Sequence, residues 1–392
     1  MINYILNAGD HDGFRALEWK QLLLPGPVTL HPDVQLSQAL PMINHRGTEF
    51  RELMRQVISK LRKIYGCDCD IALLTASGTG AIEAMLINFL APNEKLLVVQ
   101  TGVFSDRMAK IAKTLGMEVE LIEPKEGEGI TPEELDSVMK RVKPDAVGVV
   151  ANETSTGVAH KNLEELAKVV HSNDAIILVD AVSYLGGHEL HMDSMDLDAV
   201  ASATQKALMS PPGLSFVAYR ERAAQRLQEV PRRSVYWDFL SYKKFYDEKH
   251  ETPATPAVST MFALNKALDI ILEIGLSNWI NRHRAFAEAL NFAIERSGGK
   301  VYPHPNWRSN TIVVPYVPEG MTPAMVKNLA KEKWGLEIGS GGWKIKEKTV
   351  RIGTMGWYGR NVVYRAIRMI VDIYGGEKSV AEEAFDYYLS LL

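Results

Sequence analysis

Two charged residues stand at the ends of apolar runs, where a charge is costly unless it has a use. Lys206 closes the run Asp198–Lys206, and Asp180 closes the run Ala175–Asp180. A buried lysine is unfavourable unless it is paired, deprotonated or covalently bonded. A lysine that forms an imine and a carboxylate that binds a pyridine nitrogen are two groups that a pyridoxal phosphate site needs. The pair suggests such a site, whereas Lys206 taken alone is also explained by an ammonium that reaches solvent.

A run of small polar residues, Ser77-Gly-Thr-Gly80, follows the apolar run Ile71–Thr75 and opens the helical pattern Ala81–Leu90. Small residues allow backbone N–H groups to approach a phosphate, and a helix N-terminus adds a partial positive charge. The run matches neither G-x-x-x-x-G-K-[ST] nor G-x-G-x-x-G, which argues against a nucleotide site. It is a candidate phosphate cradle, and a plain strand-to-helix turn is the alternative.

Two further segments end apolar runs with groups that can bind a ligand. Phe104 follows the run Lys95–Gln100, where an aromatic ring either stacks on a flat ligand or packs in the core. Asn152–Gly157 follows the run Ala146–Ala151 and offers an amide and hydroxyls. Each segment alone reads as a turn or a packing residue. Five polar clusters at successive strand ends favour a binding edge instead.

The elements that must position these groups alternate short apolar runs with helical segments. Most runs are apolar on both faces, as in strands buried between helix layers. Thr131–Glu134 and Asn162–Glu165 read as capping boxes at helix starts. The pattern predicts an open, largely parallel α/β sheet that binds ligands at the carboxyl ends of its strands. The runs are Ile71–Thr75, Lys95–Gln100, Glu118–Ile122, Ala146–Ala151, Ala175–Asp180, Ala199–Ala203 and Ser215–Tyr219.

The pattern changes after about residue 260. The elements expected there are helices over Ser259–Arg296 with a break near Gly275, a helix from Thr322 to Gly335, a helix near Asn361–Tyr374, and strands at Asn310–Pro315, Leu336–Gly339 and Thr349–Gly353. They predict a smaller α+β lobe. We place an N-terminal arm at residues 1–24, a large cofactor-binding domain at 25–270 and a small C-terminal domain at 271–392.

Composition narrows the class of protein. A chain of 392 residues with a net charge of −4 suits two lobes and implies no nucleic-acid partner. No apolar run reaches the ~18 residues of a membrane span, and no Cys/His cluster completes a metal site. The acidic residues near the N-terminus argue against a transit peptide, so we expect a cytoplasmic protein. Cys67 and Cys69 are predicted to be free thiols, because an extended chain places them poorly for a disulfide.

Eight short motifs occur in order between about residues 22 and 375. They are Pro25-Gly-Pro27, Asn44-His-Arg-Gly47, Ser77-Gly-Thr79, Glu153-Thr-Ser-Thr-Gly157, Asp180-Ala-Val-Ser183, Ser202-Ala-Thr-Gln-Lys206, Pro211-Pro-Gly213 and Val350-Arg-Ile-Gly353. Together they resemble the class V aminotransferases of pyridoxal phosphate fold type I, in particular the serine–pyruvate/alanine–glyoxylate and serine–glyoxylate group. The resemblance implies a large domain with a mainly parallel seven-stranded sheet between helices, followed by a smaller α+β domain.

The resemblance also implies roles for individual residues. Lys206 would hold the cofactor as a Schiff base and then move a proton, while Asp180 would pair with the pyridinium. Arg351 would bind the substrate carboxylate with its guanidinium fork, and Gly26 and His45 would border the substrate pocket. The remaining cofactor contacts implied are Ser77, Gly78, Thr79 and Gln205 at the phosphate, Phe104 and Val182 on the two ring faces, Thr154 at the phenolic oxygen, and Thr255 at the phosphate of a neighbouring subunit.

Two positions depart from the family pattern. Phe104 stands where many relatives have tryptophan, which reduces the stacking surface, and Thr252 stands where relatives often have tyrosine. A site shared between subunits implies a homodimer.

The activity implied is a ping-pong transfer of the amino group of serine or alanine to glyoxylate or pyruvate. An aminotransferase for 2-aminoethylphosphonate or (S)-ureidoglycine is an alternative on the same scaffold. A cysteine desulfurase is disfavoured because it needs a cysteine in the C-terminal half, and none follows Cys69. A non-catalytic protein of this fold is disfavoured because Lys206 is present.

Overall fold

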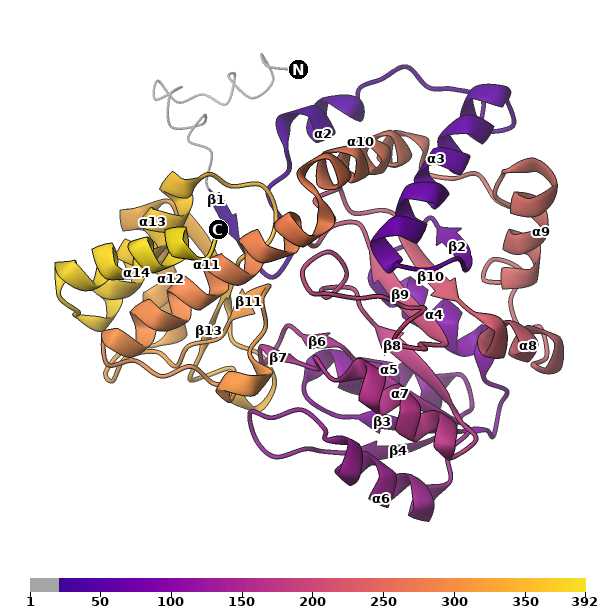
Figure 1. Ribbon diagram of the computed structural model, residues 1–392, viewed down its shortest axis with the longest axis horizontal. Coiled ribbons are helices and arrows are strands. Elements are labelled where there is room, and N and C mark those ends of the chain that lie inside the picture. Colours follow the sequence, from indigo (N-terminus) through magenta and orange to yellow (C-terminus); the bar gives the residue numbers. More distant parts are fainter. Residues whose placement is uncertain (1–20) are drawn as a thin grey trace.

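The computed structural model describes residues 21–392 (Figure 1). Most of the predicted N-terminal arm, residues 1–20, therefore lies outside the described residues. The segment that follows it, Gln21–Leu23, forms strand β1. Within the described range, no helix combines the length and the apolar character that crossing a membrane requires.

A seven-stranded sheet with the order β2-β10-β9-β8-β5-β3-β4 forms the centre of the larger lobe. Strand β10 runs antiparallel to both of its neighbours, and the remaining pairs are parallel. This confirms the predicted mainly parallel sheet, and the apolar runs locate its strands to within a residue. The strands are β2 (Asp70–Leu74), β3 (Lys95–Val99), β4 (Glu118–Ile122), β5 (Ala146–Val150), β8 (Ile176–Asp180), β9 (Ala199–Ala203) and β10 (Ser215–Tyr219).

Helices cover both faces of this sheet (Figure 1). Successive residues of a strand point to opposite faces. Leu97 and Val99 accordingly join one buried cluster, and Leu96 and Val98 join the other. The first cluster contains α3 (Thr48–Tyr65), α6 (Pro132–Val142), α7 (Leu163–Ser172) and α10 (Val258–Ile274), with the short α2 (Pro32–Ser37) beside α10; the second contains α4 (Gly78–Phe89), α5 (Val103–Thr114), α8 (Glu221–Glu229) and α9 (Phe239–Lys249).

One of the two predicted capping boxes forms. Thr131 Oγ1 accepts a hydrogen bond from the Glu134 N–H at 3.3 Å, and Glu134 Oε2 accepts one from the Thr131 N–H at 3.1 Å. Asn162 stands at the N-cap of α7, but its side chain does not cap the helix. Its amide Nδ2 instead donates to the Ile130 carbonyl at 3.0 Å, so the second box is wrong because a tertiary contact uses the amide.

The smaller lobe is built on a four-stranded sheet with the order β1-β12-β13-β11. Gly275, at a φ of +88°, separates α10 from α11, as the predicted break requires. The predicted domain boundary at residue 270 falls within α10. The elements are α11 (Leu276–Arg296), β11 (Ile312–Val313), α12 (Pro323–Trp334), β12 (Leu336–Ser340), β13 (Val350–Gly353), α13 (Arg360–Tyr374) and α14 (Lys378–Ser390).

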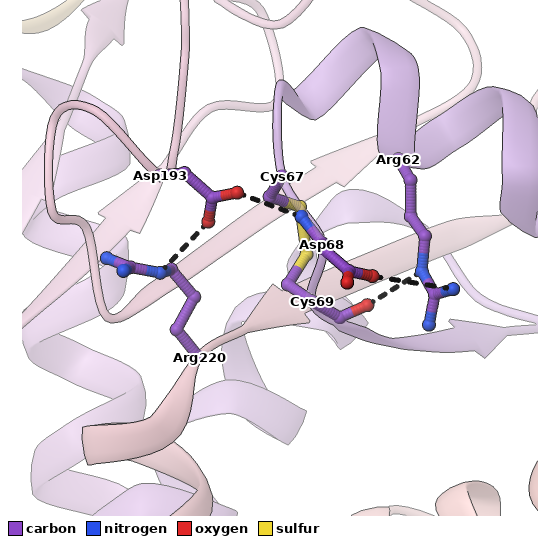
Figure 2. The surroundings of a disulfide bond; sticks show 6 residues. All are labelled: Arg62, Cys67, Asp68, Cys69, Asp193 and Arg220. Carbon is purple, nitrogen blue, oxygen red and sulfur yellow. Dashed lines mark hydrogen bonds and ion pairs between the residues drawn. A yellow bond between two sulfur atoms is a disulfide. The ribbon is translucent and has the colours of Figure 1, made fainter.

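A disulfide joins Cys67 to Cys69, so the prediction of two free thiols is wrong (Figure 2). The chain between α3 and β2 is bent rather than extended, because Gly66 ends α3 in the left-handed region at a φ of +61°. Asp193 accepts a hydrogen bond from the Asp68 N–H at 2.9 Å, which holds the bend. The two Cα atoms are consequently 5.4 Å apart, within the range that disulfides span.

Candidate active site

One cavity of about 210 Å³ opens at the carboxyl ends of the parallel strands. The loops after β2, β3, β5, β8 and β9 converge there, since these strands point the same way. The hairpin β6 (Asn152–Glu153) and β7 (Val158–Ala159) follows β5 at this edge. Nine residues singled out in the sequence line the cavity: Ser77, Gly78, Thr79, Phe104, Thr154, Asp180, Val182, Gln205 and Lys206.

Lys206 lies three residues beyond the end of β9 and is largely buried. Burial lowers the pKa of its ammonium to about 8, and the neighbouring Asp180 partly opposes this effect. Its Nζ donates a hydrogen bond to the Pro25 carbonyl. Gly26 adopts a φ of +115°, and a Cβ there would lie 2.6 Å from Lys206 Nζ. Position 26 therefore needs glycine both for its backbone and for the space that Lys206 occupies.

Asp180 is the last residue of β8, and only 7% of it is exposed. Its Oδ1 accepts a hydrogen bond from the Val182 N–H at 2.9 Å. Burial raises the pKa of the carboxyl to about 6, although this hydrogen bond and the charge of Lys206 oppose the rise. Among the described residues, no donor bonds Oδ2. The carboxyl thus has an acceptor available for a ligand at the cavity wall.

The first turn of α4 carries the residues that are expected to form a phosphate cradle. Ser77 is the N-cap, yet its side chain makes no capping hydrogen bond within the described residues, so its hydroxyl can serve a ligand. A Cβ on Gly78 would lie 2.8 Å from a methyl group of Val182, so only glycine allows this close approach. Gln205 Oε1 is buried and has no partner in the described part of the chain, a cost that a bound donor would remove.

Glu153 is a site residue that sequence reasoning quoted in a motif but did not use. It is fully buried and lies beside the cavity in β6. Its Oε2 accepts hydrogen bonds from the N–H groups of Phe104 and Ser105 at 3.0 and 3.1 Å. Its Oε1 accepts from the Ser155 hydroxyl at 2.6 Å and the Ser155 N–H at 3.2 Å. Glu153 therefore fixes the segment that carries Phe104, and an acidic residue directly after a buried strand was the available signal.

Arg351 extends from β13 of the smaller lobe toward the turn after β6. Its Nε donates to the Ser340 carbonyl at 2.5 Å, and its Nη1 donates to the Thr154 carbonyl at 3.3 Å. Burial lowers the pKa of its guanidinium. Arg351 and Gly26 thus lie at the edge of the site without lining the cavity. His45 and Thr255 do not line it either.

Two further polar residues line the cavity: Arg107, which sequence reasoning did not select, and Asn152, the amide of the segment Asn152–Gly157. Arg107 Nη1 donates to Thr79 Oγ1 at 3.1 Å. It follows Phe104 by three residues on α5, and this spacing places both on one helix face. Asn152 Nδ2 donates to Ser183 Oγ at 2.8 Å, while its Oδ1 is buried without a partner among the described residues. The i+3 spacing from Phe104 would have identified Arg107.

These groups fit pyridoxal phosphate. A buried lysine with a lowered pKa suits the aldehyde, a carboxyl with a free oxygen suits the pyridine nitrogen, and a helix N-terminus suits the phosphate. Phe104 and Val182 offer apolar surfaces for the ring. In residues 21–392, no cluster of three or more His, Cys, Asp or Glu side chains could hold a metal ion.

Comparison with known proteins agrees with this chemistry. The family model described as aminotransferase class-V matches residues 34–358. The chain is 34% identical to an uncharacterized aminotransferase of Methanocaldococcus jannaschii, over 90% of this chain and 91% of that protein. It is 30% identical to the serine–glyoxylate aminotransferase of Methylorubrum extorquens, over 86% of each. The ureidoglycine–glyoxylate aminotransferase structure from Bacillus subtilis superposes with a TM-score of 0.87 at 27% identity, covering 95% of this chain and 98% of that one.

Proposed function

The chain belongs to the class-V aminotransferases, and from this premise we propose that it moves the amino group of serine or alanine to glyoxylate or pyruvate. The transfer would run in two half-reactions, with the first 2-oxo acid leaving before the second binds. The observation that carries the proposal is one cavity in which Lys206, with a pKa lowered to about 8, lies near the buried carboxyl of Asp180.

Pyridoxal phosphate would bind at Lys206, Asp180 and the first turn of α4. When bound, it supplies an aldehyde for the amino group and a ring that withdraws the electron pair left at the substrate α-carbon. The work left to the protein is proton transfer and charge placement. Lys206 Nζ, once neutral, takes the proton from the substrate α-carbon and later delivers it. The anionic carboxyl of Asp180 keeps a proton on the pyridine nitrogen.

Arg351 would orient the substrate. Its Nε and Nη1 are held by the Ser340 and Thr154 carbonyls, which fixes the direction of the guanidinium before a substrate arrives. A fixed guanidinium can bind the α-carboxylate that serine, alanine, glyoxylate and pyruvate share. Removing it should raise KM for all four more than it lowers kcat, since the carboxylate contact exists in ground state and transition state alike.

A second candidate is a ureidoglycine–glyoxylate aminotransferase. It is favoured by the fold match at a TM-score of 0.87 to the Bacillus subtilis structure that carries this name. Ureidoglycine also has an α-amino group and an α-carboxylate, so Lys206 and Arg351 would act in the same way. The two candidates differ only in the group that the donor carries at its α-carbon.

We also propose a homodimer with a shared site. His45 and Thr255, which the family resemblance places at the site, do not line the cavity of their own chain. Leu36, Met42 and Val235 are 69%, 69% and 95% exposed. In the proposed dimer, a partner chain would cover apolar side chains such as these. Sedimentation of the purified protein at two concentrations tests this point.

A panel of amino donors against keto-acid acceptors tests the function. L-serine, L-alanine and (S)-ureidoglycine are each paired with glyoxylate and pyruvate, and each half-reaction is followed by the change in cofactor absorbance. We expect the highest kcat/KM for serine or alanine with glyoxylate. Protein that stays colourless after incubation with pyridoxal phosphate would contradict the proposal.

A further inference from the structure

We propose that Arg107 supplies the positive charge that binds the cofactor's phosphate. This inference rests on the proposed use of pyridoxal phosphate. It adds a guanidinium to a cradle otherwise composed of Ser77, Gly78, Thr79 and Gln205.

Arg107 already reaches the cradle. Its Nη1 donates to Thr79 Oγ1 at 3.1 Å, and Thr79 is the second residue of α4. Its guanidinium also lies over the ring of Phe104, 4.8 Å from the ring centre. The phosphate of a ligand bound at the N-terminus of α4 would therefore lie within reach of this side chain. Phe104 would hold the guanidinium in place by a cation–π contact.

The charge balance of the cavity favours such a cation, in addition to the partial positive charge at the N-terminus of α4. A phosphate monoester carries about −1.5 to −2 charges at neutral pH. The cradle residues Ser77, Gly78, Thr79 and Gln205 are all neutral, and Lys206 is committed to the aldehyde. Among the described residues that line the cavity, Arg107 is then the remaining cation. A guanidinium pairs with phosphate through short, charge-assisted hydrogen bonds.

In the part of the chain that the structure describes, Arg107 has no competing carboxylate partner. Within residues 21–392, no ion pair of 4.0 Å or less joins it to an Asp or Glu side chain. Other arginines differ in this respect, as Arg226 pairs with Glu94 and Glu229. The field of Arg107 also reaches Lys206, where it adds a small contribution to the pKa lowering that burial dominates. Arg107 is exposed, and among the described residues the only hydrogen bond of its side chain goes to Thr79 Oγ1, so its guanidinium is available to an anionic ligand in the cavity.

The test compares two ligands that differ only in the phosphate. Wild-type protein, Arg107→Met and Arg107→Lys are freed of cofactor, and dissociation constants are measured by absorbance for pyridoxal phosphate and for pyridoxal. We expect Arg107→Met to weaken pyridoxal phosphate by about 10- to 100-fold, the loss of one charge-assisted interaction, and to leave pyridoxal unchanged. Arg107→Lys should lose less, because it keeps the charge but not the fork.

Lys110→Met provides the matched control. Lys110 is an exposed cation on the same helix and does not line the cavity. Its replacement removes the same unit of charge and should leave both dissociation constants unchanged. Circular dichroism verifies that each variant is folded. Should Arg107→Met fold poorly, the comparison between Arg107→Lys and wild type, with added inorganic phosphate as competitor, carries the test.

The outcomes separate the possible errors. Equal weakening of pyridoxal and pyridoxal phosphate would overturn the inference, since Arg107 would then act only by supporting Phe104. Unchanged binding of both ligands would overturn it as well. Wild-type protein that binds neither ligand would refute the proposed function itself. If wild type binds pyridoxal phosphate and Arg107→Met binds it equally well, only the role of Arg107 is refuted.

Discussion

Replacing Glu153 with glutamine exchanges one carboxylate oxygen for an NH2 group inside a cluster of buried donors. The carboxylate accepts from the N–H groups of Phe104, Ser105 and Ser155 and from the Ser155 hydroxyl. Glu153 and both serines are buried. Whichever way the amide turns, its NH2 group faces at least one N–H donor. That donor then has no acceptor and no access to water.

The cost follows from counting these donors. With NH2 toward Ser155, one backbone N–H loses its acceptor, and the Ser155 hydroxyl can rotate to accept. With NH2 toward Phe104 and Ser105, two backbone N–H groups lose theirs. Each unpaired buried donor costs about 1–3 kcal/mol, and the bonds that remain lose their charge assistance. Taking the cheaper orientation, we expect the free energy of unfolding to fall by about 2–4 kcal/mol.

Burial of Glu153 opposes this expectation, because it favours the protonated carboxyl over the carboxylate. It is the largest influence on Glu153 and raises the pKa of the carboxyl, while the donors from Ser155, Ser105 and Phe104 lower it. If burial dominates, the native carboxyl is protonated and glutamine imitates it. The geometry favours the carboxylate, because a protonated carboxyl would direct an O–H toward a cluster composed mainly of N–H donors. The sign of the stability change therefore reports the charge state of Glu153.

The assay is urea unfolding of the cofactor-free protein, followed by circular dichroism at one protein concentration. Glu164→Gln is the control, because Glu164 pairs with Lys168 on the exposed side of α7 and its loss should not move the midpoint. The cofactor should also dissociate faster from the Glu153 variant, since Phe104 loses its anchor. A Glu153→Gln midpoint at or above that of wild type would refute the carboxylate assignment.

Three further predictions concern the cavity. The rate at which cofactor-free protein captures pyridoxal phosphate should rise with pH and level off above about pH 8, because the neutral amine of Lys206 reacts and burial lowers its pKa to about 8. Stopped-flow absorbance measures this rate, and a midpoint near the ordinary lysine pKa of about 10.4 would contradict the prediction. Asp180→Asn should lower kcat by about 10²–10³-fold in steady-state assays, because the pyridine nitrogen loses its anionic partner; a decrease of less than about threefold would count against that role. Gly26→Ala should slow cofactor capture and lower the urea midpoint, since its Cβ would lie 2.6 Å from Lys206 Nζ at a φ of +115°; wild-type values in both assays would show that the segment moves aside.

The large sheet could be predicted from the sequence because its strands are buried on both faces. The apolar pattern that predicts such a strand lies entirely within short runs such as Ala199–Ala203 and Ser215–Tyr219. The structure places both strands at these bounds. The parallel direction of the strands then determines that their loops meet at one edge. That is why residues as distant as Ser77 and Lys206 could be expected in one cavity.

What could not be predicted depends on contacts between distant segments. The strand expected at Asn310–Pro315 is shortened to Ile312–Val313. Residues that flank these two form hydrogen bonds with other partners; for example, the Asn310 carbonyl accepts one from the Thr354 hydroxyl. Asn162 has the right residue type for a cap but gives its amide to Ile130. The bend that brings Cys67 and Cys69 together begins at Gly66, and it is held by Asp193, which is 125 residues from Asp68 in the sequence. No local pattern contains these partners.

The motif Pro25-Gly-Pro27 reaches the site through contacts between segments that are distant in the sequence. Pro25 follows β1 of the smaller lobe, and its carbonyl accepts the hydrogen bond from Lys206 of the larger lobe. Two glycines leave room for this segment. A Cβ on Gly353 would lie 2.0 Å from the Leu24 carbonyl oxygen, and a Cβ on Gly339 would lie 3.1 Å from the Pro25 ring.

Gly339 of β12 is the residue that pairs with Arg351, and Gly353 lies two residues after Arg351 on β13. The strand that carries Arg351, the arginine proposed to bind the substrate, therefore also supports the carbonyl that accepts from Lys206. A side chain at either glycine would displace residues 24–26 and, with them, the Pro25 carbonyl. These two glycines consequently influence Lys206 without touching it, because the segment that they accommodate is one of the contacts between the two lobes at the site, beside that of Arg351 with Thr154.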